Sequence, residues 1–376
     1  MIYFNNAATG GFKPGIVKRA VVEALQSYPV NVGREVTKRS AFSEENVYKT
    51  RLFLSNYLNN GLIGKLIFTK NCTEALNYAI FGSALKGSEI VTTVTEHNSV
   101  LRPLYKLSED RGLKLKFANL DEDGKISATS ILNLVNENTA LVVMNAVSNV
   151  TGAKNEYEKV GRYLRGKIPF VVDGAQAGGR ENFDIKDDFI SCLALAGHKG
   201  LYATQGVGVL AINEDYDLSP IILGGSGTET FEKAPTSYPE KLEAGTLDYA
   251  AILSLYYGAQ FAAENQNYYN ERLKSLTNRL IDGLFGIDGI KIYSKPNIYG
   301  VVSFSALDIS STEIAEVLSN VYDISVRGGF HCAPLLHKAL KTDLNGLVRV
   351  SLSPFNEDRE VDYFLKVLPD ALSLCL

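Results

Sequence analysis

Short apolar runs alternate with longer helical patterns along the middle of the chain, and this alternation limits the possible folds more than any other feature. Seven such runs fall between residues 66 and 212: Leu66–Thr69, Glu89–Val94, Leu113–Asn119, Ala140–Val147, Pro169–Val172, Phe189–Ala196 and Gly208–Ile212. Strands separated by helices are typical of a parallel sheet with crossover connections. The sequence therefore predicts an α/β fold with a mainly parallel seven-stranded sheet.

Several of these runs end in polar residues. The polar clusters are Glu96-His97-Asn98, Ser148-Asn149, Asp173 to Gln176, and His198-Lys199. Open α/β sheets bind ligands beyond the carboxyl ends of their strands. We therefore expect the clusters to meet at one site.

The chain has 376 residues, which exceeds the usual size of a single hydrophobic core. After about residue 290 the pattern changes to strand, strand, helix, strand, loop, strand and helix, which is typical of a compact α+β unit. We predict a large domain over residues 15–285. A small C-terminal domain is expected over residues 286–376, together with residues 1–14.

Charge and cysteine usage exclude several classes of protein. The formal net charge is −4, with 38 basic residues scattered among 42 acidic ones, so we expect no nucleic-acid partner. We find neither a signal-peptide pattern nor an apolar stretch long enough to span a bilayer, and we expect a cytoplasmic protein without membrane contact. The four cysteines show no CxxC spacing and no paired framework, so we expect no metal site and no disulfide bond.

Asp173 closes an apolar run, and Lys199 lies on a glycine-flanked loop after the next run. A carboxylate at the end of a buried strand normally has a cationic partner, either a structural arginine or a pyridinium nitrogen. Lysine amines form Schiff bases with carbonyl compounds when their surroundings lower the pKa, although an isolated lysine is usually a surface residue. Together the two residues indicate a site for pyridoxal 5'-phosphate.

Two further features lie at predicted strand ends. Asn71 and Glu74 fit a helix capping box, and a helix N-terminus suits a phosphate group, although an ordinary cap has the same pattern. His97 is suited to stack on an aromatic ring or to transfer a proton, although a lone histidine here is more often structural.

Cys332 and Arg349 are the remaining candidates for chemistry. Cys332 lies five residues after Arg327 and next to His331, surroundings that favour a nucleophilic thiolate; a partly buried structural thiol is an equal alternative. Arg349 interrupts an apolar strand, where its forked guanidinium is suited to grip a carboxylate or to form a structural salt bridge.

These segments and several others form an ordered set that covers nearly the whole chain. The set comprises Asn5 to Thr9, Asn31 to Arg34, Asn71 to Glu74, Glu96 to Val100, Ser148 to Gly152, Val172 to Gln176, Gly197 to Gly200, Glu243 to Thr246 and the segment around Cys332. It resembles the class V aminotransferase family, and within it the cysteine desulfurase and selenocysteine lyase group. The resemblance implies a fold type I transferase that depends on pyridoxal 5'-phosphate.

The resemblance also implies how the cofactor ring is held. Lys199 would form the Schiff base, and Asp173 would pair with the pyridine nitrogen. His97 would stack on the ring, with Asn149 and Gln176 near its hydroxyl group.

The remaining implied contacts concern the phosphate, the subunits and the substrate. The phosphate would be held by Cys72, Thr73 and His198. Thr246 would reach the phosphate of a neighbouring subunit, which implies a homodimer, and residues 31–34 would form another element across the subunits. The implied substrate site consists of Arg349, Asn149, Ala7 and Arg327.

The implied reaction takes sulfur from L-cysteine, leaving L-alanine and a persulfide on Cys332 that a sulfur-acceptor protein would discharge. The alternatives are a selenocysteine lyase, a kynureninase-like cleavage or an aminotransferase, and a non-catalytic sulfur-relay scaffold. Three positions depart from the family pattern. Ala196 stands where relatives have a phosphate-binding serine or threonine, and Gly33 and Phe330 each replace a histidine.

Overall fold

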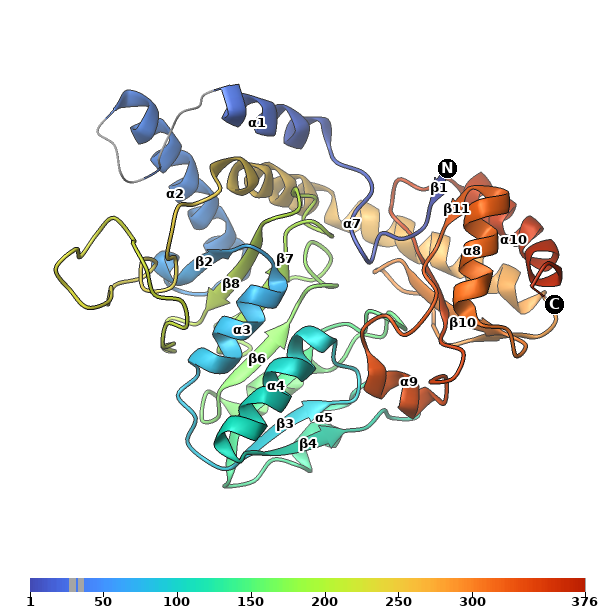
Figure 1. Ribbon diagram of the computed structural model, residues 1–376, viewed down its shortest axis with the longest axis horizontal. Coiled ribbons are helices and arrows are strands. Elements are labelled where there is room, and N and C mark those ends of the chain that lie inside the picture. Colours follow the sequence, from blue (N-terminus) through green and yellow to red (C-terminus); the bar gives the residue numbers. More distant parts are fainter. Residues whose placement is uncertain (27–31, 33–36, 376) are drawn as a thin grey trace.

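The computed structural model describes residues 1–26, 32 and 37–375 (Figure 1). Its larger part surrounds a seven-stranded sheet, and its smaller part surrounds a three-stranded sheet. The predicted α/β fold with a mainly parallel seven-stranded sheet is confirmed.

The large sheet has the strand order β2-β8-β7-β6-β5-β3-β4. Its strands are β2 (Leu66–Thr69), β3 (Glu89–Thr93), β4 (Lys114–Ala118), β5 (Thr139–Asn145), β6 (Phe170–Asp173), β7 (Cys192–Ala196) and β8 (Gly208–Ile212). Strand β8 pairs antiparallel with both of its neighbours, whereas the other pairs are parallel. No helix interrupts residues 197–207, so the chain reverses directly from β7 into β8.

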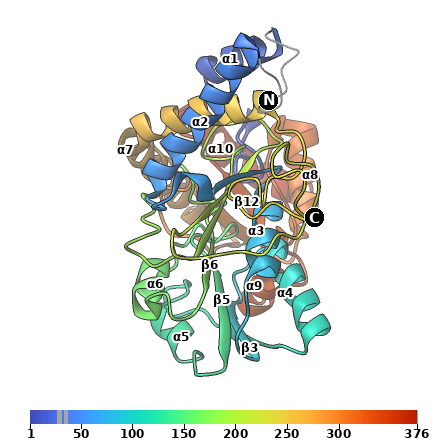
Figure 2. The same cartoon turned by 90° about the vertical axis from the view of Figure 1, so that its left-hand side faces the viewer.

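Helices cover both faces of this sheet. They are α2 (Lys38–Leu58), α3 (Cys72–Gly82), α4 (Asn98–Arg111), α5 (Ala128–Leu132), α6 (Tyr157–Leu164) and α7 (Tyr249–Phe285), with a 3-10 turn, η1 (Ile63–Lys65), before β2. Helix α1 (Gly15–Gln26) packs on α7. Figure 2 shows α5 and α6 on one side of β5 and β6, and α3 and α4 on the other.

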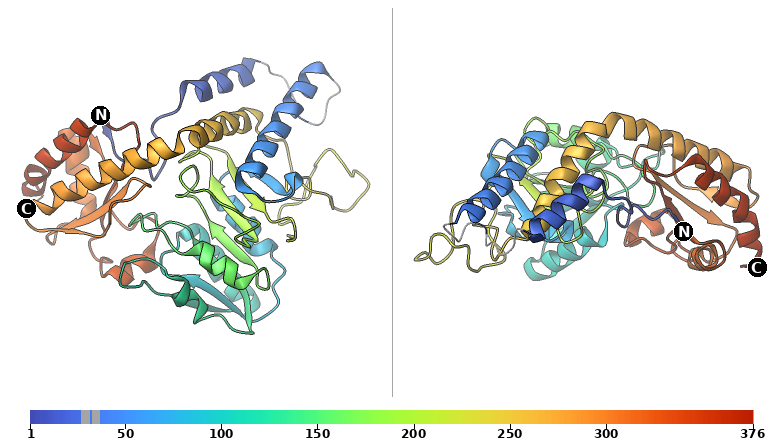
Figure 3. Two further views of the ribbon diagram at one scale, coloured as in Figure 1. Left: turned by 180° about the vertical axis from the view of Figure 1, so that it is seen from behind. Right: turned by 90° about the horizontal axis from the view of Figure 1, so that it is seen from above.

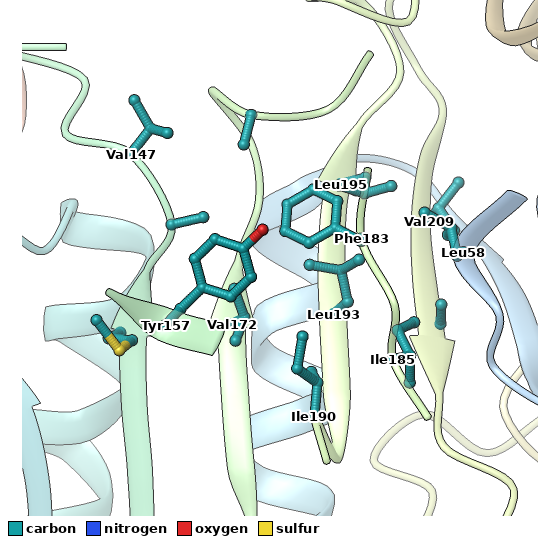
Figure 4. Packing of buried hydrophobic residues seen from close by; sticks show 14 of the residues in the cluster. Leu58, Val147, Tyr157, Val172, Phe183, Ile185, Ile190, Leu193, Leu195 and Val209 are labelled. Atoms are coloured by element: carbon teal, nitrogen blue, oxygen red, sulfur yellow. The ribbon is translucent and has the colours of Figure 1, made fainter. Parts of the chain in front are cut away.

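The apolar strand residues divide between two buried cores. On β5, Val142 and Met144 pack with α2, α6 and α7, whereas Leu141 and Val143 pack with α3 and α4. Successive strand side chains point to opposite faces, so a sheet covered on both sides needs continuous apolar strands. Figure 4 shows part of the first core, in which the ring of Tyr157 lies 5.4 Å from that of Phe183.

The smaller part of the molecule contains about the last quarter of the chain and the first residues. Its three-stranded antiparallel sheet has the order β12-β10-β9. Its elements are β9 (Ile290–Ile292), β10 (Val301–Ala306), α8 (Ser311–Tyr322), β11 (Ile324–Ser325), α9 (Pro334–Leu340), β12 (Val348–Ser351) and α10 (Asp358–Ser373). The N-terminal strand β1 (Ile2–Tyr3) pairs with β11, as the positions of the N-terminus and β11 in Figure 1 show.

Helix α7 connects the two parts (Figure 3). Its first turns bury Ile252 and Leu255 in the core of the large sheet. Its later turns bury Leu273 and Leu280 in the core of the small sheet. Helix α7 therefore belongs to both cores, and the division into two domains at residue 286 is a proposal.

Candidate active site

A cavity of about 250 Å³ lies beyond the carboxyl ends of β5, β6 and β7. The structure brings eleven of the predicted site residues to its wall: Ala7, Cys72, Thr73, His97, Asn149, Asp173, Gln176, His198, Lys199, Arg327 and Arg349. The predicted meeting of the polar clusters at one site is therefore what the structure shows.

Lys199 lies in the tight turn that follows β7, and its side chain is half-buried. Removal from water lowers the pKa of its amine, an effect that Asp173 opposes and that Arg349 and Arg327 reinforce. Within the described residues the amine forms no hydrogen bond or ion pair. An amine of this kind is available for covalent attachment to a carbonyl compound.

Asp173 is the last residue of β6 and is 5 % exposed. Its Oδ1 accepts hydrogen bonds from the backbone N–H of Ala175 at 2.9 Å and from the Cys72 thiol at 3.6 Å. Burial raises the pKa of Cys72 well above its usual range, and the neighbouring Asp173 carboxylate acts in the same direction. Cys72 is therefore a neutral thiol that donates to Asp173.

Helix α3 begins at the cavity wall, next to Thr73. The Asn71 side chain caps the helix by accepting the N–H of Glu74 at 2.9 Å. The predicted capping box is wrong in its second bond, because the Glu74 carboxylate accepts the N–H of Lys70 and not that of Asn71. The Asn71 cap leaves other N–H groups of the first turn free to bind an anion.

His97 is the N-cap residue of α4 and faces the same cavity. Its Nδ1 accepts the backbone N–H of Ser99 at 3.1 Å, which places the proton of the neutral ring on Nε2. Burial lowers the pKa of His97, and the nearby Asp173 opposes this effect. The ring is therefore a neutral aromatic surface at neutral pH.

Arg349 and Asn149 form a buried polar pair on the other side of the cavity. Arg349 donates to the Asn149 carbonyl at 3.0 Å and to the Asn5 side chain at 3.2 Å. Burial lowers the pKa of Arg349 to about 9. The Arg349 Nε and the Asn149 Oδ1 are both buried, and neither has a hydrogen-bond partner in the described part of the chain. Buried polar atoms without partners are uncommon, and here both belong to residues of the cavity wall.

The loop that carries Cys332 is attached to the cavity at three points. The N–H of Asn98 donates to the Cys332 carbonyl at 2.7 Å, and Asn149 Nδ2 donates to the His331 carbonyl at 2.8 Å. Arg327, which lines the cavity, places Nη2 3.8 Å from the Cys332 sulfur. Cys332 does not line the cavity itself, but the guanidinium of Arg327 connects the thiol to it.

Comparison with known proteins agrees with this geometry. The family model described as Aminotransferase class-V matches residues 2–364. The chain belongs to this family.

Two relatives and one solved structure illustrate the similarity to other class V members. A probable cysteine desulfurase of Pyrococcus abyssi is 33% identical, over 98% of this chain and 94% of the relative. Cysteine desulfurase IscS of Clostridium botulinum is 30% identical, over 98% of this chain and 93% of the relative. The apo structure of a cysteine desulfurase from Thermococcus onnurineus NA1 has a TM-score of 0.90 and 31% identity, covering 99% of this chain and 94% of that one.

The other positions singled out in the sequence of this class V chain lie partly at the cavity and partly away from it. Thr246 is exposed and does not line it. Asn31, Gly33 and Arg34 lie outside the described residues. Ala196 lines the cavity and offers no hydroxyl group there. Phe330 is 46% exposed, and its ring packs edge-on against His337.

The structure also adds residues that sequence reasoning missed. Asn145 lines the cavity from the end of β5, although its position inside an apolar run hid it. Lys13 donates to the His198 carbonyl at 3.0 Å, and burial lowers the pKa of Lys13 to about 8. Thr9 contacts His198 Nδ1 at 3.0 Å. No local pattern marks Lys13, since its contact joins residues 185 positions apart in the chain.

Between residues 1 and 375, leaving out 27–31 and 33–36, no cluster of three or more histidine, cysteine, aspartate or glutamate side chains is suited to hold a metal ion. Over the same residues, no helix has both the length and the apolar character needed to cross a membrane.

Proposed function

We propose that this protein is a cysteine desulfurase that depends on pyridoxal 5'-phosphate, takes sulfur from L-cysteine, and leaves L-alanine and a persulfide on Cys332. The observation that carries the proposal is the contact between the Cys332 thiol and Arg327 at the wall of the lysine-containing cavity. The relatives named cysteine desulfurase support the same activity.

The residues of the cavity fit the proposed cofactor. Lys199 offers an amine that has no partner within the described residues, and Asp173 offers a carboxylate with no cation bound to it there. The neutral His97 ring and the orphaned Oδ1 of Asn149 suit an aromatic ring that carries a hydroxyl group. Near the N-terminus of α3, Thr73 would contact the phosphate. One hydroxyl contact is absent, because the residue at position 196 is alanine.

Pyridoxal phosphate, when bound, supplies a ring that accepts electrons from the α-carbon of an amino acid. Lys199 would attach the cofactor and, once released, would move the α-proton with its amine. Burial supports both roles, because it lowers the pKa of Lys199 and so increases the neutral fraction of the amine. Asp173 would hold the pyridine nitrogen in its protonated form.

Arg349 is suited to hold the substrate carboxylate. Each of its terminal nitrogens carries two N–H bonds, and the described contacts use one on each. The Arg327 guanidinium donates to the Cys332 sulfur at 3.8 Å, and the nucleophile of the reaction would be the thiolate of Cys332. The thiolate would then attack the sulfur of the substrate; the S–S bond forms as the C–S bond breaks, and the carbon side takes up a proton to give alanine.

The partners of the reaction belong to the same proposal. Thr246 is exposed at the end of a surface loop, which suits a contact with the phosphate site of a second subunit in a homodimer. A sulfur-acceptor protein would remove the persulfide sulfur from Cys332. We expect these events to occur in the cytoplasm.

Mass analysis of Cys332 after incubation with L-cysteine tests the function. We expect one added sulfur on Cys332, together with release of alanine, and sulfide when a reducing thiol is present. Cys332→Ala should abolish sulfur transfer, whereas the control Cys375→Ala should leave it intact. Turnover of L-cysteine that survives in Cys332→Ala would instead favour a class V reaction in which this thiol takes no part. Retention of the yellow cofactor without any turnover would favour a scaffold.

A further inference from the structure

Glu96 is a fully buried acid next to the site that the proposed mechanism does not use. It lies between the end of β3 and His97. Its Oε1 accepts the backbone N–H of Asn145 at 3.0 Å and lies 2.5 Å from Thr93 Oγ1. Its Oε2 is buried and has no hydrogen-bond partner among the residues that the structure describes. A buried carboxylate normally requires a cation, but the charged group that acts on Glu96 is the negative Asp173.

The contact with Thr93 is the first link of a chain of oxygen atoms. Thr93 Oγ1 lies 2.7 Å from Thr95 Oγ1, and Thr95 Oγ1 lies 2.9 Å from Asn145 Oδ1. The orientation of the Asn145 amide is fixed, because its Nδ2 donates to the Thr95 carbonyl at 2.7 Å. Its Oδ1 also accepts from Asn155 Nδ2 at 2.6 Å. Asn145 Oδ1 is therefore an acceptor and brings no proton to the chain.

The number of protons available to this chain of oxygen atoms determines the protonation state of Glu96. The chain has three short oxygen–oxygen contacts: Glu96 to Thr93, Thr93 to Thr95, and Thr95 to Asn145. Each contact needs one proton, and each of the two threonine hydroxyls supplies one. The third proton must come from the Glu96 carboxyl group, which then donates to Thr93. Burial agrees with this count, because it raises the pKa of Glu96 to about 8.

We propose that Glu96 is a neutral carboxylic acid that positions the floor of the site, holding Asn145 and His97 in place without adding a second negative charge beside Asp173. Asn145 lines the cavity and stands next to Asp173 in the register of β5 and β6. His97 follows Glu96 directly in the chain. The positioning role rests on the proposed function, because Asp173 and His97 are assigned there to the cofactor ring.

Loss of the Glu96 proton changes both the geometry and the charge of the site. An ionised Glu96 leaves the chain one proton short, so one of the three contacts becomes a repulsion between lone pairs. It also places a second negative charge near Asp173 and raises the pKa of His97. The other polar groups that face Glu96 are Thr93 from its own segment and Asn145 from β5, and neither carries a charge. Activity should therefore fall as Glu96 loses its proton.

Infrared spectroscopy of the whole protein tests the protonation state without any substrate. At neutral pH the protein should show the C=O band of a buried carboxylic acid, and Glu96→Gln should lack that band. The exposed Glu109→Gln is the matched control and should retain it. In Thr95→Val the Thr93 hydroxyl no longer has to donate to Thr95 and can donate to Glu96 instead. That hydrogen bond favours the ionised carboxylate, so the carboxylic-acid band should disappear at a lower pH in this variant. If the band is absent from the unmodified protein and from all three variants, the proposal is overturned.

Urea unfolding gives a second readout. The unfolded chain releases the Glu96 proton near its usual pKa of 4.5, whereas the folded chain keeps it to about 8. The urea concentration at the midpoint of unfolding should therefore fall, relative to that of Glu96→Gln, as the pH rises from 4.5 to about 8. Parallel curves for the two proteins would contradict a neutral Glu96.

Turnover of L-cysteine against pH tests the positioning role. An amide group cannot both accept the Asn145 N–H and donate to Thr93 from one atom, as Oε1 of the neutral acid does, so Glu96→Gln loses one hydrogen bond of the chain. The turnover rate of this variant should be about tenfold lower at neutral pH. The turnover rate of Glu96→Gln should also decline less at alkaline pH, because the ionisation of Glu96 no longer contributes to the decline. An unchanged alkaline decline would refute the positioning role even if the infrared band is present. If the band is present but the protein does not use L-cysteine, the proposed function fails and the neutral state of Glu96 stands.

Discussion

The ion pair between Arg51 and Glu243 gives the sharpest test of how this fold is held together. Arg51 Nη1 and Nη2 lie 2.8 and 2.9 Å from the two carboxylate oxygens of Glu243. The two side chains are only 7% and 5% exposed. The pair attaches the segment before α7 to the edge of the large sheet, because Glu243 Oε1 also accepts the N–H of Phe68 in β2 at 2.7 Å.

Replacing Arg51 with methionine keeps most of the apolar stem but leaves the Glu243 carboxylate buried without its cation. Breaking a buried pair in this way costs about 3–5 kcal/mol of unfolding free energy. The double variant Arg51→Met/Glu243→Gln keeps an acceptor for the N–H of Phe68 and removes the charge. We expect the double variant to be more stable than the single one by about 1–3 kcal/mol.

Urea unfolding followed by circular dichroism measures these differences, provided that the m-value is unchanged. The matched control is Arg279→Met, because Arg279 also makes two hydrogen bonds to one carboxylate, from Nε and Nη2 to Asp362, but with side chains 47% and 49% exposed. This control should cost less than about 1 kcal/mol. The reasoning is refuted if the two single variants cost the same, or if the double variant is no more stable than Arg51→Met.

Three further predictions concern the site. Lys199→Ala should abolish both the yellow colour and the turnover of L-cysteine, as measured by absorbance and alanine release, whereas Lys13→Ala should keep some colour. Burial lowers the pKa of His198 to about 4, so the unfolded chain takes up a proton first as the pH falls below 6.5. The folded state therefore loses stability as the pH falls. At about pH 5 the loss in unfolding free energy due to His198 is roughly 2 kcal/mol, and urea titrations of His198→Gln should not show it. A Cβ atom at Gly200 would lie 2.1 Å from the Gly178 carbonyl oxygen, so Gly200→Ala should destabilise the protein by about 1–3 kcal/mol and weaken cofactor binding in a spectroscopic titration.

The large sheet could be predicted because its strands are continuous apolar runs, a consequence of burial on both faces. The predicted runs Leu66–Thr69 and Gly208–Ile212 coincide with β2 and β8. The run Phe189–Ala196 begins three residues too early, because Phe189 has a left-handed backbone (φ 53°) and pairing with β6 starts at Cys192. Hydrophobicity marks a buried segment, but the backbone conformation decides where the strand begins.

The meeting of polar clusters at one edge of the sheet also followed from the sequence, since parallel strands end on the same side. The contacts within the site did not follow. Arg327 reaches Cys332 because its backbone pairs with that of Arg349 at the edge strand β12. The proposed neutral state of Glu96 depends on a chain of contacts through Thr93, Thr95 and Asn145, which lie at or just beyond the ends of β3 and β5. Both features depend on contacts between distant segments, which a local pattern does not encode.

Helix α7 has a mechanical consequence for catalysis. A helix of 37 residues is about 55 Å long, and its two halves are embedded in different cores. A tilt of about one degree over that length displaces one end by about 1 Å. Arg349 moves with the small sheet, while Lys199 moves with the large one. The distance between the cation for the substrate carboxylate and the lysine amine therefore depends on the stiffness of this helix as well as on the hydrogen bond from Arg349 to the Asn149 carbonyl. A helix-softening glycine at an exposed position such as Tyr268 would act on catalysis from outside the cavity.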